Sequence, residues 1–288
     1  MRSSVQFAGL LLAALSWSGA GAVVSVAAPP AMILVVCAPG YPGSTEEAQP
    51  TMDALAAAIT AAAGWKPGDL KAIYFETEQG GLQRLRSDDA AVAISPVAFW
   101  LQHRGGLGLE PLMQAIEEGG QAAEPWTLVA AAGQVSGSSS LAGFELISVA
   151  GYVPRFVRGP VLGAWGDLPR DVKITYSSAV LTGLRRASAG AKVALLLDRA
   201  QAAALPTLPF AARLQVVTRS APLPVTVLSS VGGRLPAAKQ HALVRALASL
   251  GATAAGANAL AGVRLSRFVA ADQAALARTR DVFDRIKE

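Results

Sequence analysis

The sequence predicts an α/β protein in which mostly parallel sheets are flanked by helices. Short apolar runs bounded by turn residues recur along the chain, and the two clearest lie within Lys192–Leu205 and Leu214–Leu228. Runs of this length suit buried parallel strands, although a buried helix can produce the same pattern. The composition agrees, because a chain that is 52% hydrophobic and only 6% aromatic is typical of a folded, helix-rich α/β protein.

The N-terminus is predicted to be a signal peptide, residues 1–27. Arg2 precedes the apolar stretch 7–17, and small residues follow it. Both 20–22 and 25–27 fit a small-x-small cleavage site, and we expect cleavage after Ala27 and export to the periplasm. The alternative is an uncleaved membrane anchor, because no charged residue occurs between Arg2 and Glu46.

The mature chain is expected to hold about 260 residues, enough for one large domain or two modest ones. Its formal charge falls from +5 to +4 when Arg2 is removed, since 24 basic residues then face 20 acidic ones. These charges are scattered, and the lack of a Lys/Arg cluster argues against nucleic acid as a partner. Cys37 is the single cysteine, so no internal disulfide is expected, and it is interpreted as a buried strand residue.

The first predicted strand, residues 31–38, leads through a turn-rich loop to a helix that begins at about residue 49 and ends at Gly64. The loop contains Tyr41, Ser44 and Thr45. Hydroxyl and backbone N–H groups near a helix start suit an anion or another small solute. An ordinary strand-to-helix connection would carry the same residues.

A strand at 70–76, a helix at 77–86 and a strand at 90–94 are predicted next. Ser95 and Pro96 then suit the N-cap and first position of another helix. Ser95 is a candidate solute donor, and a plain N-cap is the alternative. The two roles are compatible, because helix N-termini present free N–H groups.

Residues 126–132 form a predicted strand, and the Gly- and Ser-rich stretch 133–140 marks a loop at which we expect the chain to cross between lobes. A strand, a loop and a helix are predicted within 141–166. Tyr152 lies in that loop, and Arg155 lies in the first helical turn after Pro154. An arginine there opposes the helix dipole, which indicates an anion or a carboxylate as its partner.

The second half is predicted to contain a strand at 172–176 ending at Ser177, a helix through 180–187, and the two apolar runs. Asp198 and Ser220 follow those runs, at the carboxyl ends where open parallel sheets bind ligands. For Asp198 the alternative is the N-cap of the next helix. A helix at 235–250, closed by Gly251, and a charged helix at 271–287 complete the chain, the latter expected to pack on the first lobe.

The strand ending in Asp198, together with the Ser-Ala-Pro-Leu-Pro stretch 220–224 after Val216-Val217, resembles the second lobe of type 2 periplasmic solute-binding proteins. The similarity is to the phosphate/phosphite/phosphonate-binding group that serves ABC importers, and it extends over about 31–288. It implies a first lobe at 28–130 and 224–288, a second lobe at 131–223, and a solute between them. It also implies a monomer without enzymatic activity or a cofactor, an anionic solute and a membrane ABC permease as partner.

The resemblance and the residue patterns together give one set of ligand-binding candidates: Tyr41, Ser44, Thr45, Ser95, Tyr152, Arg155, Ser177, Asp198 and Ser220. Family members that bind phosphonates have small hydroxyl residues where this chain has Tyr152 and Arg155, so the solute itself is left open.

Two other function classes remain open at this stage. The same fold can serve as a ligand-sensing domain for a signalling partner, and an enzyme can be built on the same scaffold. Enzyme signatures are poor, because His103 and His241 are the only histidines and neither has a second ligand at metal-binding spacing. The stretch 133–137 also lacks the serine position of a nucleophile elbow.

Overall fold

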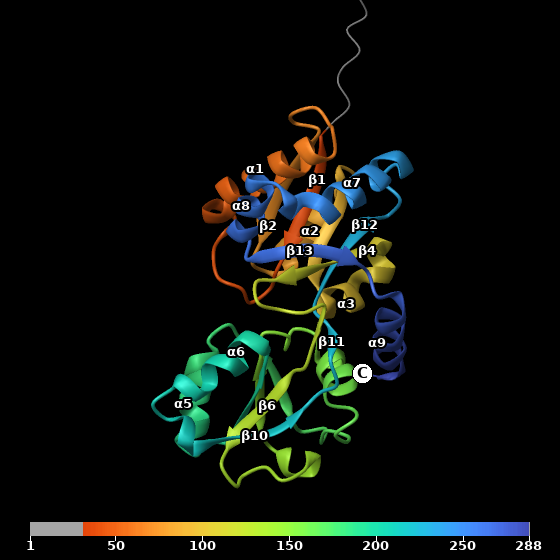
Figure 1. The fold of residues 1–288 in the computed structure, drawn as a ribbon. Coiled ribbons are helices and arrows are strands. Elements are labelled where there is room, and N and C mark those ends of the chain that lie inside the picture. Colours follow the sequence, from red (N-terminus) through yellow and green to blue (C-terminus); the bar gives the residue numbers. More distant parts are fainter. Residues whose placement is uncertain (1–30, 288) are drawn as a thin grey trace, which may run out of the picture.

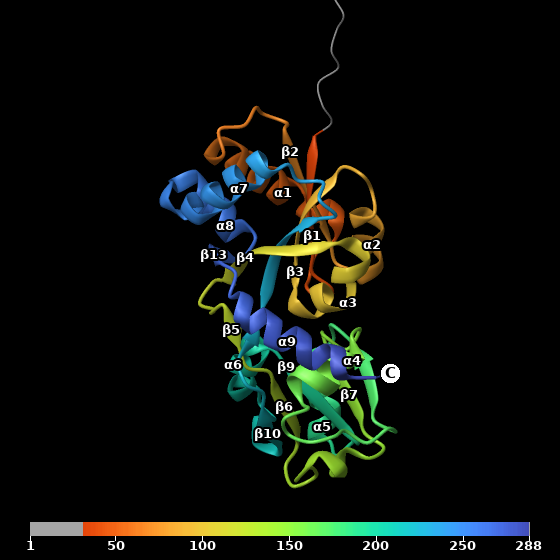
Figure 2. The same ribbon diagram turned by 90° about the vertical axis from the view of Figure 1, so that its right-hand side faces the viewer.

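A computed structural model describes residues 31–287, so the predicted signal peptide lies outside the described residues. Two lobes, each a mixed sheet flanked by helices, lie one above the other in Figures 1 and 2. The predicted α/β class and two-lobed architecture are therefore confirmed, but the sheets are mixed rather than mostly parallel, because strands β12, β13, β6 and β10 pair antiparallel with their neighbours.

The first lobe contains a six-stranded sheet in the order β13-β4-β12-β3-β1-β2. The strands at one side, β1, β2 and β3, are parallel, whereas β12 runs antiparallel to both β3 and β4 and β13 runs antiparallel to β4. The bounds are β1 (Met32–Cys37), β2 (Leu70–Phe75), β3 (Ala90–Pro96), β4 (Leu109–Glu117), β12 (Thr226–Val231) and β13 (Leu265–Ala270).

The helices of this lobe are α1 (Thr45–Ala62), α2 (Glu78–Leu85), α3 (Val97–Leu107), α7 (Ala237–Ser249) and α8 (Ala254–Gly262), with the short turn η5 (Leu250–Ala252) before α8. The predicted N-terminal ends of two helices, α1 and α3, were wrong. Helix α1 begins near residue 45 because Ser44 and Glu47 form a reciprocal capping box. Ser95 is not an N-cap, because β3 continues through Pro96, which itself precedes α3.

The second lobe contains a five-stranded sheet in the order β10-β6-β9-β7-β8. Its strands are β6 (Thr127–Ala131), β7 (Glu145–Ser148), β8 (Lys173–Tyr176), β9 (Val193–Leu197) and β10 (Leu214–Arg219). The first apolar run is a fully buried strand, β9, parallel to β7, as predicted. The second run is not a buried parallel strand, because β10 lies at the sheet edge, antiparallel to β6, with Val216 40% exposed.

The helical segments of this lobe are short. They are α4 (Pro154–Phe156), α5 (Val180–Ser188) and α6 (Arg199–Ala204), with the turns η1 (Ser138–Leu141), η2 (Val157–Val161, π-helical), η3 (Leu205–Thr207) and η4 (Ala211–Arg213).

The two lobes are joined by a small antiparallel pair of strands, β5 (Ala123–Glu124) and β11 (Leu223–Pro224). Because β6 already belongs to the second sheet, the first crossing lies before Thr127 rather than in the Gly- and Ser-rich stretch 133–140. That stretch is a turn after β6 within the second lobe, and its composition signalled a loop without indicating where the lobe begins.

The last helix, α9 (Gln273–Arg285), packs on both lobes rather than on the first alone, and both views show it across their junction (Figures 1 and 2). At its start the Asp272 N–H donates to Gln114 of β4, and near its end Asp284 forms an ion pair with Arg104 of α3. It also packs against η2 and β11.

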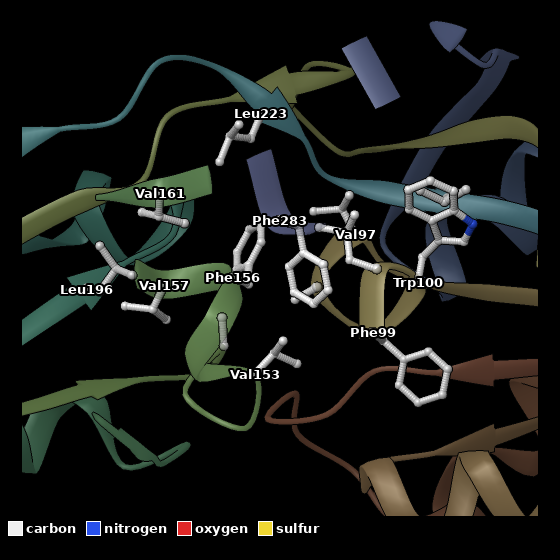
Figure 3. Close-up of a cluster of buried hydrophobic side chains, with 14 of the residues drawn as sticks. Val97, Phe99, Trp100, Val153, Phe156, Val157, Val161, Leu196, Leu223 and Phe283 are labelled. Carbon is white, nitrogen blue, oxygen red and sulfur yellow. The ribbon is translucent and has the colours of Figure 1, made fainter. Parts of the chain in front are cut away.

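One apolar cluster crosses between the lobes beneath α9, as Figure 3 shows. Phe283 lies between side chains of α3 and side chains of α4 and η2. The labelled members are Val97, Phe99, Trp100, Val153, Phe156, Val157, Val161, Leu196, Leu223 and Phe283. This shared core fixes one side of the interlobe cleft.

Within the described residues no single helix has the length and apolarity to cross a membrane, and one pair, 237–252 with 254–262, has them only when counted together across a 96° bend.

Candidate solute-binding cleft

A cavity with an internal volume of about 50 Å³ lies between the lobes beside the β5–β11 crossing. The first lobe contributes the loop after β1, the start of α3 and the end of β4 to its walls. The crossing strands form a second part, and the loop after β7 with the start of α6 forms the part from the second lobe. The residues used below are Tyr41, Val97, Ala98, Glu117, Glu124, Trp126, Tyr152, Asp198, Arg199 and Ala200.

The lobes touch each other at the loop that follows β1. A Cβ atom on Gly40 would lie 3.1 Å from the Val149 Cβ and 3.4 Å from the Tyr176 ring, both in the second lobe. Gly40 also has a φ of +89°, which side-chain-bearing residues rarely adopt. The glycine therefore permits a close approach of the two lobes at the edge of the cavity.

Tyr41 forms part of the first-lobe wall. Its backbone carbonyl accepts a hydrogen bond from the Tyr74 hydroxyl at 3.3 Å, which anchors the loop to β2. Burial raises the pKa of Tyr41 above its usual range, and the nearby carboxylates Glu117 and Asp198 raise it further. Its phenol therefore stays protonated at neutral pH and can donate a hydrogen bond to a solute.

Tyr152 forms part of the second-lobe wall. The preceding Gly151 lies so close to the backbone of Thr175 that a Cβ would come within 2.4 Å of the Thr175 carbonyl oxygen, and this approach fixes the loop on β8. The Tyr152 ring packs edge-to-face on Tyr176 at 5.9 Å. Its hydroxyl oxygen is buried without a partner among the described residues, and an orphaned buried donor of this kind is costly.

Asp198 lies at the carboxyl end of β9 and caps α6. One of its oxygens accepts from the Gln201 N–H at 2.8 Å, while the Gln201 side chain accepts from the Asp198 N–H at 3.2 Å. The N-cap role is therefore confirmed, and the same side chain also lines the cavity. Burial is the main cause that raises the pKa of Asp198 above the ordinary aspartate value.

The remaining charges in the cavity are Glu117, Glu124 and Arg199. The Arg199 guanidinium donates to Glu124 at 2.8 Å and to the Glu118 carbonyl at 3.2 Å, which links the second lobe to the crossing strand. Glu117 has no ion pair or hydrogen bond to its carboxylate from any residue in 31–287. Burial, followed by Asp198 and Glu124, raises the pKa of Glu117 despite the opposing effect of Arg199.

Glu117→Gln is expected to stabilise the unliganded protein at neutral and alkaline pH. A carboxyl whose pKa is higher in the folded than in the unfolded state destabilises the fold when ionised, and this cost disappears as the pH falls below the unfolded-state pKa. Urea unfolding of both proteins between pH 4 and pH 8 should show an advantage for the variant that grows with pH. An advantage that is equal at all pH values would contradict the assignment.

The structure brings three of the nine predicted site residues to the cavity: Tyr41, Tyr152 and Asp198. The other six are not among its lining residues, and five of these are hydroxyl residues. Ser44 caps α1, Thr45 donates to Glu76, Ser95 lies buried in β3 opposite Val227, Ser177 accepts from the Ala179 N–H, and Ser220 accepts from the Trp126 N–H.

Arg155 meets the negative end of a helix rather than a solute. Its guanidinium donates to the carbonyls of Ile286, at 3.1 Å, and Phe283, at 3.3 Å, at the C-terminus of α9. It also stacks over the Phe283 ring, 4.5 Å from the centroid. The predicted anion or carboxylate partner of Arg155 is therefore wrong: the guanidinium meets neutral carbonyls at the negative end of the α9 dipole, and the Phe283 carbonyl also accepts from the Ile286 N–H.

Sequence reasoning missed Glu117, Glu124, Trp126 and Arg199. Glu117 is the last residue of β4, and Glu124 and Trp126 flank a proline at the lobe crossing. The positions of these residues point to a site only if the first lobe crossing is placed before Thr127. No three His, Cys, Asp or Glu side chains within 31–287 are grouped so that they could hold a metal ion.

Neither a protein-family model nor a curated protein sequence matches the chain. Solved structures do match its fold. The Xanthomonas citri protein XAC2383, bound to ATP, aligns with a TM-score of 0.68 at 15% identity over 88% of this chain and 98% of its own.

Two further structures with a matching fold concern phosphonates. The binding-protein component of an ABC phosphonate transporter from Pseudomonas aeruginosa aligns with a TM-score of 0.62 at 16% identity, over 88% of this chain and 85% of that one. PhnD1 of Prochlorococcus marinus, in complex with methylphosphonate, aligns with a TM-score of 0.63 at 12% identity, over 88% and 97%. At these identities the similarity shows the fold of the chain. That fold is the fold of type 2 periplasmic binding proteins.

Proposed function

We propose that the protein is the solute-binding component of an ABC importer and that its two lobes close on a small solute in the interlobe cavity. No chemical step is involved, because binding shifts the population between open and closed arrangements of the lobes. We also propose that it works in the periplasm, where the predicted signal peptide would deliver it and where it would meet a membrane permease.

The observation that carries this proposal is the convergence of polar side chains from both lobes on one cavity beside the crossing strands. Tyr41 comes from the first lobe, Tyr152 and Asp198 come from the second, and Glu124 comes from the crossing itself. Ligand sites in proteins are typically concave, mostly apolar and fitted with a few polar groups of this kind. Closure would bring both walls onto the solute.

Small phosphate-like acids are the first solutes to test. Two structures of the same fold are described as a phosphonate transporter component and a methylphosphonate complex. In this chain Val97 and Ala98, in the first turn of α3, line the cavity. The Val97 N–H already donates to the Val225 carbonyl, so the start of α3 would favour an anionic group through its dipole and through the next N–H groups of its first turn.

The proposal is tested by titrating the protein with phosphate, phosphite, alkylphosphonates, sulfate and small organic acids while tryptophan fluorescence is recorded. Trp126 lines the cavity, so a bound solute should change its emission in a saturable manner. The same solute should raise the melting temperature, since it binds only the folded state. Trp126→Phe should remove most of the fluorescence change, and a change that persists unaltered would place the solute elsewhere.

Transport is tested in cells. A strain without the protein should take up the identified solute more slowly, and wild-type protein should restore the uptake. Normal uptake in the deletion strain would contradict the importer role while leaving solute binding intact.

A further inference from the structure

The lobes also touch at a second place, the loop after β1. In the second lobe the rings of Tyr152 and Tyr176 pack edge-to-face at 5.9 Å, and the Tyr176 ring lies 3.4 Å from the position of a Cβ on Gly40. Tyr152 also packs against the apolar cluster that contains Cys37 of β1. This contact is made by the chain's own residues, so it does not depend on a solute.

The hydroxyl of Tyr152 is buried and has no hydrogen-bond partner among the described residues. Burial raises the pKa of Tyr152, and its neighbours Cys37 and Glu78 in the first lobe raise it further. Neither neighbour lines the interlobe cavity, so this hydroxyl lies against the first lobe rather than against the cavity carboxylates. An unpaired buried hydroxyl costs free energy, and most buried polar groups in folded proteins have a partner.

Glu78 is the first residue of α2 and lies next to Cys37. Helix α2 packs so closely on β1 that a Cβ on Gly81 would collide with the Cys37 sulfur, and the Cys37 thiol donates to the carbonyl of the N-cap residue Thr77 at 3.6 Å. One oxygen of Glu78, Oε1, lies 2.7 Å from the His103 Nε2. The other oxygen, Oε2, has no hydrogen bond or ion pair to any residue in 31–287.

Of the two neighbours, Glu78 is the better acceptor for the Tyr152 hydroxyl. A thiol sulfur is a weak acceptor, and the Cys37 thiol is already turned toward the Thr77 carbonyl. A carboxylate accepts at both of its oxygens, and a hydrogen bond from a hydroxyl to a carboxylate is roughly twice as strong as one between neutral groups. The partner that the buried hydroxyl needs is therefore present in the opposite lobe.

We propose that Tyr152 and Glu78 form a clasp between the lobes, in which the Tyr152 hydroxyl donates to the second oxygen of the Glu78 carboxylate and holds the lobes together without a solute. The first oxygen stays at His103, whose ring packs 4.6 Å from that of Phe99 in the cluster that the lobes share. Figure 3 shows Phe99 and Val153, the residue after Tyr152, on the two sides of the lobe junction. The clasp goes beyond the proposed function, because it acts on the lobes whichever solute they bind.

The first test is a double-mutant cycle on the mature chain without added solute, measured by urea unfolding. Tyr152→Phe removes the hydroxyl and keeps the ring, and Glu78→Ala removes the acceptor. Tyr152→Phe should lower the folding equilibrium constant at least about tenfold in the wild-type background, about 1.4 kcal/mol, and by less than about twofold in the Glu78→Ala background. Asp88→Ala, which removes an exposed carboxylate of the same lobe, is the matched control and should leave the effect of Tyr152→Phe unchanged.

The distance between the lobes provides a second readout. Paramagnetic labels are attached through Ala54→Cys in α1 and Ala189→Cys after α5, two exposed positions. Cys37 should stay unlabelled, because it is buried and burial raises the pKa of its thiol. Without solute, Tyr152→Phe should shift the label distances to longer values. Tyr74→Phe should not, because the Tyr74 hydroxyl donates only to carbonyls within the first lobe.

A Tyr152→Phe change that is neutral or stabilising in both backgrounds would overturn the clasp, since removal of a truly unpaired hydroxyl has that effect. An equal loss of stability with and without Glu78 would overturn it too, because the hydroxyl would then have another partner. If Glu78→Ala fails to fold, the label distances decide, and unchanged distances in Tyr152→Phe contradict the clasp. Since no solute is used, these outcomes leave the proposed solute-binding function untouched.

Discussion

Phe283→Ala is expected to lower the free energy of unfolding by about 3–5 kcal/mol, the range for removing a buried aromatic side chain. Phe283 is 2% exposed and lies in the apolar cluster that α3, α4, η2 and α9 share. Its ring also lies below two guanidinium groups, those of Arg155 at 4.5 Å and Arg104 at 5.8 Å. The truncation would remove contacts from both lobes at once.

Urea unfolding followed by circular dichroism measures this effect. Arg278→Ala is the matched control, because Arg278 is exposed on the same helix and its loss should change stability by less than about 0.5 kcal/mol. If Phe283→Ala cost no more than Arg278→Ala, α9 would not contribute to a core shared by the lobes.

Arg155→Ala is expected to lower stability by about 2 kcal/mol and to leave solute affinity unchanged within about twofold. The guanidinium holds the last carbonyls of α9 and covers the Phe283 ring, and it is absent from the cavity wall. Arg155→Lys should recover part of the stability, because a lysine retains the charge but cannot reproduce the planar donor pair.

Calorimetric titration of Arg155→Ala at a temperature where it is fully folded measures its solute affinity separately from its loss of stability. The sequence alone suggested that Arg155 contacts an anionic solute, which predicts the opposite result: lost affinity with retained stability. Lost affinity with retained stability would indicate that Arg155 contacts the solute, and it would contradict the role of Arg155 as a cap of α9.

Local signals predicted most of the elements. The fully buried strand β9, Asp198 as the N-cap of α6 and Pro154 at the first position of α4 follow from short-range patterns of apolar residues, caps and prolines. The start of α1 was missed because the capping box of Ser44 and Glu47 was not used, although both residues are visible in the sequence.

The strand partners and the site were harder to predict, because they depend on contacts between distant residues. The apolar run at β10 gave no sign that its strand lies antiparallel at an edge. Ser220 sits at a strand end as expected, yet its hydroxyl is occupied by the Trp126 N–H across the crossing. Glu117 became a candidate only when folding placed the end of β4 beside α6 in one cavity.

The most direct test of the central claim, that solute binds in the interlobe cavity, is the affinity of the Ala200→Trp variant for the solute found with the wild type. Ala200 lines the cavity from α6 and is exposed, so a large side chain can occupy the solute's space without disturbing the core. Ala203→Trp, also exposed on α6 but outside the cavity, is the control. We predict at least about a tenfold loss of affinity for Ala200→Trp alone, about 1.4 kcal/mol. Wild-type affinity in a folded Ala200→Trp protein would contradict the account.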